Sequence, residues 1–177
     1  TRYLWSHTSA YRGFLEFGWL NWFAKLIIPP AFAIMRRWDK KAAQRPDIFI
    51  ANSVTTRDRI AEYYARESHI VYPFLPPRKV LWEGMERKFF VCLGRVVPYK
   101  KFDIAVEACN ALKIPLKIFT STHNAVTDKL QKMSWPTIGW IFDASDEEVS
   151  RALEGAKGFI MPQEEDFGIV ALEAMAH

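Results

Sequence analysis

The chain has 177 residues, half of them apolar and a quarter charged, and its formal net charge is +4. This composition excludes a disordered chain, and the length suits one ordinary domain or parts of two. The two cysteines, Cys92 and Cys109, lie in apolar patterns without metal-ligand spacing, so we expect neither a disulfide framework nor a cysteine metal site, and a cytosolic compartment is favoured.

The charge is divided unevenly along the chain. Residues 1–80 carry 13 Lys and Arg against 6 Asp and Glu, whereas residues 81–177 carry 11 against 14. The basic half also contains four of the seven tryptophans. A basic, aromatic surface suits an anionic membrane, an anionic substrate or a nucleic acid. The simpler interpretation is a cationic surface over an aromatic core.

In chain order, the first predicted elements are helices between Tyr3 and about Arg45, and we expect the pair Pro29-Pro30 to break them. Residues 14–35 form the most apolar stretch of the chain. Charged residues and the two prolines interrupt this stretch, so we predict no transmembrane helix, and an interfacial helix stays an alternative.

Two short strands and a helix follow. We expect the strands at 47–51 and 69–72, with a helix between them that Asn52-Ser53 caps and that turns Ile60 and Tyr64 inward. The segment PFLPP at 73–77 cannot continue a sheet, because proline lacks the N–H that a ladder needs. We therefore predict a linker there.

Beyond the linker, strands and helices alternate. The expected strands are Phe89–Leu93, Leu116–Phe119 and Gly158–Met161, and Ile138–Phe142 is expected as a strand or an extended loop. The expected helices cover 102–112, with an apolar stripe that ends at Leu112, 126–133, a segment that Asp143 and Ser145 open as caps, and 169–176. This alternation predicts an α/β fold with a Rossmann-like parallel sheet, right-handed crossovers and flanking helices. Ligands of such sheets bind beyond the carboxyl ends of the strands, which selects the loops Gly94–Lys101 and Pro162–Gly168.

The first loop carries two cations, Arg95 and Lys100, between a strand and a helix. A guanidinium forms a planar fork for phosphate oxygens, and an ammonium is a movable point charge, so together they suit a pyrophosphate. Two solvated surface cations beside a turn explain the same spacing equally well.

The second loop joins a carboxylate to a helix start. Glu165 lies in the loop, and the backbone N–H groups of Gly168, Ile169 and Val170 would form an anion site at the helix end. Glu173 lies about one turn into that helix, and carboxylates accept hydrogen bonds from sugar hydroxyls. The ligand that this combination indicates is a nucleotide sugar, while a solvated Glu165 and a Glu173 without a particular role form the alternative.

These residues lie in segments with a family resemblance. CLGRVVPYKKFDIAVEA (92–108) and PQEEDFGIVALEAMAH (162–177) resemble the group 1 glycosyltransferases, the large retaining family 4 with the GT-B fold. Two glutamates with seven residues between them, followed by EAMA, are characteristic of that family. RYLW (2–5) and WDKKAAQRPDIFIANS (38–53) resemble its mannosyltransferase-like members.

The resemblance implies a role for each matched residue. Arg95 and Lys100 correspond to the basic pair that holds the donor pyrophosphate and stabilises its leaving charge. Glu165 corresponds to the glutamate that faces the transferred sugar, and Glu173 to the one that binds the ribose hydroxyls. The remaining matches are the turn whose backbone meets sugar and phosphate, Phe167, Gly168 and Ile169, and the neighbourhood of Ile141, which would lie near the base.

Some positions depart from the family. Relatives usually have a glycine-containing turn where this chain has TSTHNA (120–125), and the hydroxyls of Thr120 and Ser121 are candidate substitutes. Ala171 stands where a proline is common. The glycine-rich loop and histidine of the acceptor domain have no counterpart here, and His7, His69, His123 and His177 read as surface or packing residues. We therefore expect the chain to be part of a longer enzyme.

The resulting hypothesis divides the chain into the end of an acceptor-side domain (1–72), a hinge (73–79) and an incomplete donor-binding domain (80–177). We expect a cytoplasmic hexosyltransferase that uses GDP-mannose, retains the anomeric configuration and needs no cofactor or metal. The expected partners are the nucleotide-sugar donor, a glycan or lipid-linked acceptor of polysaccharide biosynthesis, and a peripheral contact at the inner face of the cell membrane.

Three alternatives remain beside this hypothesis: a UDP-hexose-dependent transferase, a noncatalytic sugar-nucleotide-binding module and a nucleic-acid-binding domain. The acidic second half, and a sequence without a recognised nucleic-acid-binding motif, argue against the last. No nucleic acid is therefore among the expected partners.

Overall fold

The computed structural model describes residues 2–5, 21–75 and 86–177, and the chain forms two compact units, Thr1–Pro73 and Phe74–His177. The domain limits expected from the sequence stay predictions, because most of the expected hinge, from residue 76 on, lies outside the described residues, as does His7. We describe each unit by itself.

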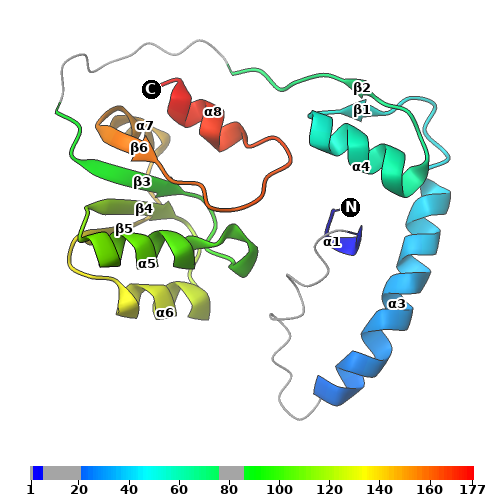
Figure 1. Ribbon diagram of the computed structural model, residues 1–177, viewed down its shortest axis with the longest axis horizontal. Helices are drawn as coiled ribbons and strands as arrows, with labels where there is room; N and C mark the ends of the chain where they lie inside the picture. The colour runs from blue at the N-terminus through cyan, green and yellow to red at the C-terminus, as the bar shows by residue number, and fades with distance from the viewer. Residues whose placement is uncertain (1, 6–20, 76–85) are drawn as a thin grey trace. The chain divides into compact units, whose positions relative to one another are not determined.

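The first unit contains one long helix, α3 (Asn21–Ala42), after a single helical turn, α1 (Arg2–Trp5). The expected break at Pro29-Pro30 is wrong, because α3 continues through both prolines as one helix (Figure 1). Each proline removes one backbone donor, and the turns on either side of the pair maintain the helix. None of the helices in the described residues is both long enough and apolar enough to cross a bilayer.

The rest of this unit is a small parallel ladder with a helix. Strands β1 (Ile50–Ala51) and β2 (His69–Ile70) pair in parallel and are shorter than the sequence pattern suggests. Helix α4 (Val54–Tyr64) lies between them in the chain. Ser53 caps α4 by accepting from the Thr56 N–H, and Ile60 is buried, as expected.

Asp39 on α3 connects the helices of this unit. Its carboxylate accepts hydrogen bonds of 2.8 Å from the Trp5 indole and from the Tyr64 hydroxyl. The Trp5 ring also stacks on Tyr63, with ring centroids 5.0 Å apart. These contacts bring the first residues of the chain against α3 and α4, so Trp5 and Tyr64 contribute to packing.

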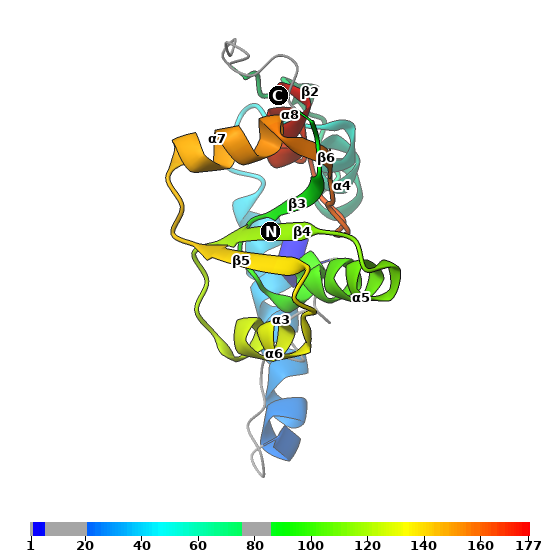
Figure 2. The same ribbon diagram turned by 90° about the vertical axis from the view of Figure 1, so that its left-hand side faces the viewer.

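The second unit is a four-stranded parallel sheet with the order β5-β4-β3-β6 (Figures 1 and 2). Its strands are β3 (Phe89–Leu93), β4 (Leu116–Thr120), β5 (Ile138–Phe142) and β6 (Ala156–Phe159). The first strand of the unit therefore lies inside the sheet, and the chain reverses its direction of strand addition between β5 and β6. This order is that of a doubly wound fold.

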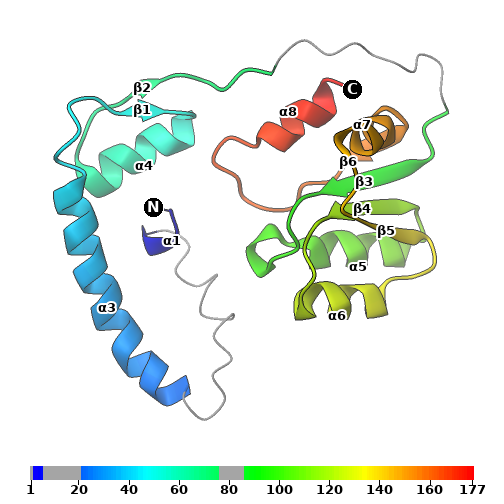
Figure 3. The same cartoon turned by 180° about the vertical axis from the view of Figure 1, so that it is seen from behind.

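Helices cover both faces of this sheet (Figure 2). Helices α5 (Phe102–Leu112) and α6 (Ala125–Met133) pack on one face over Cys92, Leu116 and Ile118. The opposite face packs Val91 and Phe119 against α7 (Asp146–Glu154), and α8 (Ile169–Met175) lies on that side (Figure 3). Burial on both faces explains the continuous apolar run of β3.

Two details differ from the expectations. Strand β6 begins and ends two residues earlier than predicted, and the ladder then continues as the Ile160 N–H donates to the Val91 carbonyl at 2.8 Å. Leu112, expected to be the last core residue of the α5 stripe, is exposed, because α5 ends there and the chain turns away through Lys113 in a left-handed conformation.

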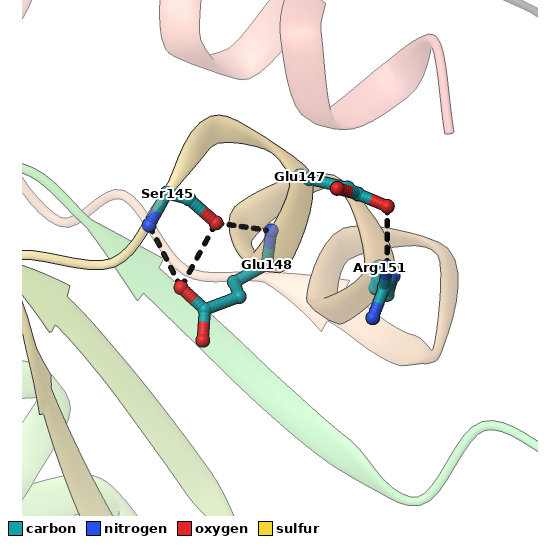
Figure 4. Close-up of polar contacts among 4 residues, drawn as sticks. All are labelled: Ser145, Glu147, Glu148 and Arg151. Carbon is teal, nitrogen blue, oxygen red and sulfur yellow. Dashed lines mark hydrogen bonds and ion pairs between the residues drawn. The ribbon is translucent and has the colours of Figure 1, made fainter.

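Helix α7 begins with a reciprocal cap (Figure 4). The Ser145 hydroxyl accepts from the Glu148 N–H, and the Glu148 carboxylate accepts from the Ser145 N–H at 2.8 Å and from its hydroxyl at 2.9 Å. Hydrogen bonds from the Ser145 backbone and side chain lower the pKa of Glu148 below its usual value. The cap fixes the start of the helix that forms one wall of the site described next.

Candidate functional site

The candidate site lies at the carboxyl ends of β3, β4 and β5, beside the switch point between β3 and β6. The loops that follow β3 and β6 leave neighbouring strands in the same direction, because the two strands are parallel. Crevices at switch points of this kind are where doubly wound sheets bind ligands. The topology thus brings the two loops selected from the sequence to one place.

Hydrogen bonds and a buried side chain hold the loop after β3 in place. Gly94 has φ +138°, a backbone conformation that residues with a side chain rarely adopt. Its N–H donates to the Phe119 carbonyl at 3.0 Å. Val96 is fully buried, and its carbonyl accepts from the Asn124 side chain. A single 3-10 turn, η2 (Pro98–Lys100), then ends the loop. The backbone before and after Arg95 is therefore anchored in the core.

The loop after β6 ends at Gly168, which precedes α8 with φ +78° and ψ +50°. A Cβ at this position would lie 3.3 Å from the end of the Met161 side chain. Glycine avoids both the left-handed strain and this contact. Its carbonyl accepts from the N–H groups of Ala171 and Leu172, so it forms the first turn of α8.

An ion pair joins the two loops. The Lys100 ammonium donates to the Glu165 carboxylate, and each side chain is only 20% exposed. The Gln163 amide donates to the same oxygen at 3.2 Å. Lys100 also lies 5.9 Å from the centroid of the Tyr99 ring. The structure therefore brings together two residues that lie 65 positions apart in the chain and were selected independently from the sequence.

A cavity of about 340 Å³ lies at the carboxyl ends of β3, β4 and β5. Its lining comes from the ends of three strands and from the two helices on that face: Leu93, Gly94, Arg95, Phe119, Thr120, Ser121, Asp143, Ala144, Asp146, Val149, Leu153 and Glu173. The wall combines apolar side chains with hydroxyls, carboxylates and one guanidinium. Such a mixture suits a polar ligand of moderate size, with the guanidinium as a donor to phosphate oxygens and the carboxylates as acceptors from hydroxyls.

The predicted residues divide between these two features. Arg95 and Glu173 both line the cavity, while Lys100 and Glu165 form the ion pair and are not part of the lining. Phe167 lies in the loop after β6, partly buried, and Ile169 is exposed at the start of α8.

Ile141, expected near the base, packs with the apolar cluster under α7. Asp143 and Ala144, which follow it closely in the chain, line the cavity instead.

Asp143 is a cavity residue that sequence reasoning assigned only to a helix cap. It has φ +50°, its N–H donates to the Thr120 carbonyl at 3.1 Å, and its carboxylate lies 3.2 Å from His123 Nε2. His123 in turn stacks on Phe142, with centroids 4.7 Å apart. Its place directly after β5 is the signal that could have selected it, since ligands of parallel sheets bind beyond the carboxyl ends of the strands.

The core behind the site contains a strongly perturbed thiol. Burial, followed by the effect of Cys109, raises the pKa of Cys92 to about 12, and its thiol donates to the Ile160 carbonyl at 3.2 Å. At neutral pH this thiol is protonated and serves in packing.

Among the described residues, no group of three or more His, Cys, Asp and Glu side chains could hold a metal ion. The expectation that the reaction needs neither metal nor cofactor stays a prediction.

Comparisons with known proteins agree with this arrangement. The family model described as "Glycosyl transferases group 1" matches residues 76–177, more than half of the chain. Among curated proteins, no sequence matches. Among solved structures, the chain is similar to the crystal structure of TarM with a TM-score of 0.65 and 17% identity.

The likeness to TarM covers 79% of this chain and 30% of the TarM chain. At 17% identity it bears on the fold alone, and the α/β fold with a Rossmann-like parallel sheet, expected from the sequence, is confirmed. This chain spans less than a third of the length of that structure.

Proposed function

Because the chain belongs to the group 1 glycosyl transferases, we propose that its second unit binds the nucleoside diphosphate of a sugar donor in the cavity between β3 and α8. The reacting sugar then lies toward the Lys100–Glu165 pair. The observation that carries this proposal is that two distant loops and helix α8 bring four charged residues to the carboxyl ends of the strands.

The chemistry follows from the charges. When the bond between the anomeric carbon and the diphosphate breaks, negative charge develops on the departing diphosphate. Arg95 and Lys100 stabilise that charge electrostatically, and the start of α8 adds backbone N–H groups of Gly168 and Ile169. The acceptor hydroxyl forms the new bond to the anomeric carbon, and its proton passes to the departing diphosphate oxygen.

The two carboxylates take different partners in this proposal. Glu173, inside the cavity, accepts hydrogen bonds from the ribose hydroxyls. Glu165, beside Lys100, faces the transferred sugar and compensates the positive charge of its oxocarbenium-like transition state. The departing diphosphate needs no metal where two cations already face it.

We further propose GDP-mannose as the donor, transfer with retention, and a glycan or lipid-linked acceptor. The support for these finer statements is the sequence resemblance to mannosyltransferase-like members of family 4. A UDP-hexose is the alternative donor. We also propose a cytoplasmic enzyme that contacts the membrane peripherally.

The test is a donor screen on the full-length enzyme that monitors the release of GDP and UDP. We expect release from GDP-mannose, and a loss of kcat on the order of 10²-fold or more for Arg95→Ala and for Glu165→Ala. Arg57→Ala is a matched control, because this exposed arginine pairs with its neighbour Asp58 in the first unit. Full activity in both site variants would contradict the site assignment.

A noncatalytic sugar-nucleotide-binding module is the second candidate. It would bind GDP or UDP through Arg95 and Glu173 but release no diphosphate from any sugar donor. Turnover in the same screen separates the two candidates, and the Lys100–Glu165 pair favours the enzyme because simple binding does not require a carboxylate beside the sugar.

A further inference from the structure

Helix α8 carries Glu173 but has few anchors of its own. It contains seven residues, and none of its side chains is buried. Ile169 and Met175 are 43% and 82% exposed, and Ala174 packs against the apolar cluster of the α7 face. A helix of this length is not stable by itself in water. Tertiary contacts, those of Ala174 and those at the C-terminal end, therefore hold α8 in place.

The buried contact at the C-terminal end of α8 joins two polar side chains, His177 and Glu154. The His177 side chain is 2% exposed, and its Nδ1 lies 3.5 Å from a carboxylate oxygen of Glu154, which is 1% exposed. The second ring nitrogen, Nε2, lies 3.5 Å from the Ser150 hydroxyl. Both Ser150 and Glu154 belong to α7, one helical turn apart, so the imidazole faces polar groups of α7 on both sides.

The backbone at this end is also held. The His177 carbonyl accepts from the Arg87 guanidinium at 3.5 Å, and the His177 N–H donates to the Ala174 carbonyl at 3.4 Å. His177 lies four positions after Glu173, which corresponds to about 6 Å along a helix. A shift of the imidazole relative to α7 would therefore move the Glu173 carboxylate relative to the cavity.

We propose that Glu154 and His177 are positioning residues for donor binding. Their buried contact fixes α8 against α7 and thereby holds Glu173 in the lining of the cavity. Neither residue touches the cavity itself, so both act through Glu173. This inference rests on the proposed donor site, and it adds two residues that the family motif does not assign.

The test uses the full-length enzyme and the variant Glu154→Ala. We expect the KM for the donor to rise on the order of tenfold to a hundredfold with kcat nearly unchanged, because ribose binding is the same in the ground and transition states. Glu154→Gln keeps the size and the acceptor oxygen and should retain a KM close to the unaltered value.

A double-mutant cycle separates positioning from general destabilisation. In a Glu173→Ala background, Glu154→Ala should raise the KM no further, because the group that it positions is absent. Glu147→Gln is the matched control, since Glu147 is an exposed carboxylate on the same helix that pairs with Arg151. If Glu154→Ala fails to fold, judged by its Tm, His177→Ala takes its place in the cycle.

An unchanged KM in Glu154→Ala, or effects of Glu154→Ala and Glu173→Ala that multiply, would overturn the inference. Calorimetric titration of the unaltered enzyme with GDP and UDP distinguishes a failure of the proposed function from a failure of this inference. If the enzyme bound neither nucleotide, the proposed function would fail together with this inference. If the unaltered enzyme bound one of them and Glu154→Ala left the KM for the donor unchanged, this inference alone would fail.

Discussion

At the scale of single residues, the pairing of Glu165 with Lys100 is the main result. The sequence placed each residue in a loop and left solvated side chains as an alternative. The structure shows both largely buried and joined, with Gln163 as a second donor to Glu165. No local pattern predicts this pairing, because it depends on which strands become neighbours. Gln163 was missed for the same reason.

Gly168 allows a first prediction. Gly168→Ala should lower the free energy of unfolding by about 1 to 2 kcal/mol, because alanine must adopt the left-handed conformation. The measurement is chemical denaturation followed by circular dichroism. Gly139→Ala is the control, since a Cβ there meets nothing within 4 Å, and it should change stability by less than about 0.5 kcal/mol. Equal effects of the two substitutions would contradict a cost from the left-handed backbone conformation of Gly168.

Cys92 allows a prediction about alkaline pH. Its pKa is about 12 in the folded chain against an ordinary value of 9.0, so the unfolded chain loses this proton first. The stability that the buried thiol contributes is therefore complete below pH 9 and is lost as the pH rises from 9 toward 12. Thermal unfolding between pH 8 and 11 should show a steeper fall in Tm for the unaltered chain than for Cys92→Ala.

The fall in Tm should not vanish in Cys92→Ala, because the pKa values of Cys109 and Tyr64 are also raised, the latter to about 12. Burial is the first cause for both, and Asp39 adds to it for Tyr64. Identical pH profiles of the two chains would show that Cys92 does not contribute.

At the scale of elements, periodicity predicted β3 and α5 with their observed limits, because β3 is a continuous apolar run and α5 has an apolar stripe that is buried except at Leu112. The segment Ile138–Phe142, expected as a strand or an extended loop, is the strand β5. The failures have physical causes. Propensity predicts a break at Pro29-Pro30, but α3 is long enough to hold its structure on both sides. The limits of β6 depend on pairing with β3, which includes a register shift at Phe89 and Phe90 that no local pattern shows.

The cap of α7 allows a prediction at this scale. Ser145→Ala removes both hydrogen bonds of the Ser145 hydroxyl with Glu148, keeps the bond from the Ser145 backbone N–H, and should lower the free energy of unfolding by about 1 kcal/mol at neutral pH. The contribution of Glu148 is present above its unfolded pKa of 4.5 and is lost as the pH falls through its lower folded pKa. Denaturation at pH 7 and pH 3 should therefore show a smaller effect of Glu148→Gln at pH 3. An effect equal at both pH values would contradict the cap.

The outer face of α3 allows a second element-scale prediction. Ile27, Ile34 and Trp38 are exposed, and their spacing of seven and four places them on one side of the helix. The exposed residues between 26 and 42 include Arg37, Lys40 and Lys41 and no acidic residue. We expect the full-length protein to sediment with vesicles of phosphatidylcholine and phosphatidylglycerol, and Ile34→Ser with Trp38→Ser to reduce binding at least several-fold.

The control for this experiment is Val54→Ser, which removes an exposed apolar side chain from α4 in the same unit. It should leave vesicle binding unchanged. Equal binding to vesicles of phosphatidylcholine alone, or loss of binding in the control, would argue against an anionic lipid surface at α3.

At the scale of the whole molecule, the sequence predicted the α/β class and the Rossmann-like sheet, because alternation of elements fixes handedness and layering. It did not predict the composition of the cavity, which draws on three strand ends and two helices. The rule that parallel sheets bind ligands beyond the carboxyl ends of their strands selects one end of the sheet. Which residues line the cavity there depends on the order of the strands.

The relation to longer proteins leads to a prediction for the 177-residue chain. Glycosyl transfer needs an acceptor site as well as a donor site, and this chain spans 30% of the TarM structure that it resembles. We expect the chain by itself to bind GDP weakly and to show no turnover of a nucleotide sugar. Measurable release of diphosphate from GDP-mannose by this chain would contradict that expectation, with the full-length enzyme as the reference.

The inner position of β3 has a consequence for how the protein is made. One of its partners, β4, emerges from the ribosome soon after it, but β6 and the Glu165 loop follow roughly 65 residues later. Until that point the unfinished sheet exposes one edge of β3, and Lys100 cannot form its ion pair with Glu165. Contacts so distant in sequence form slowly, so nucleotide binding should appear last during refolding and should report that the whole unit is complete.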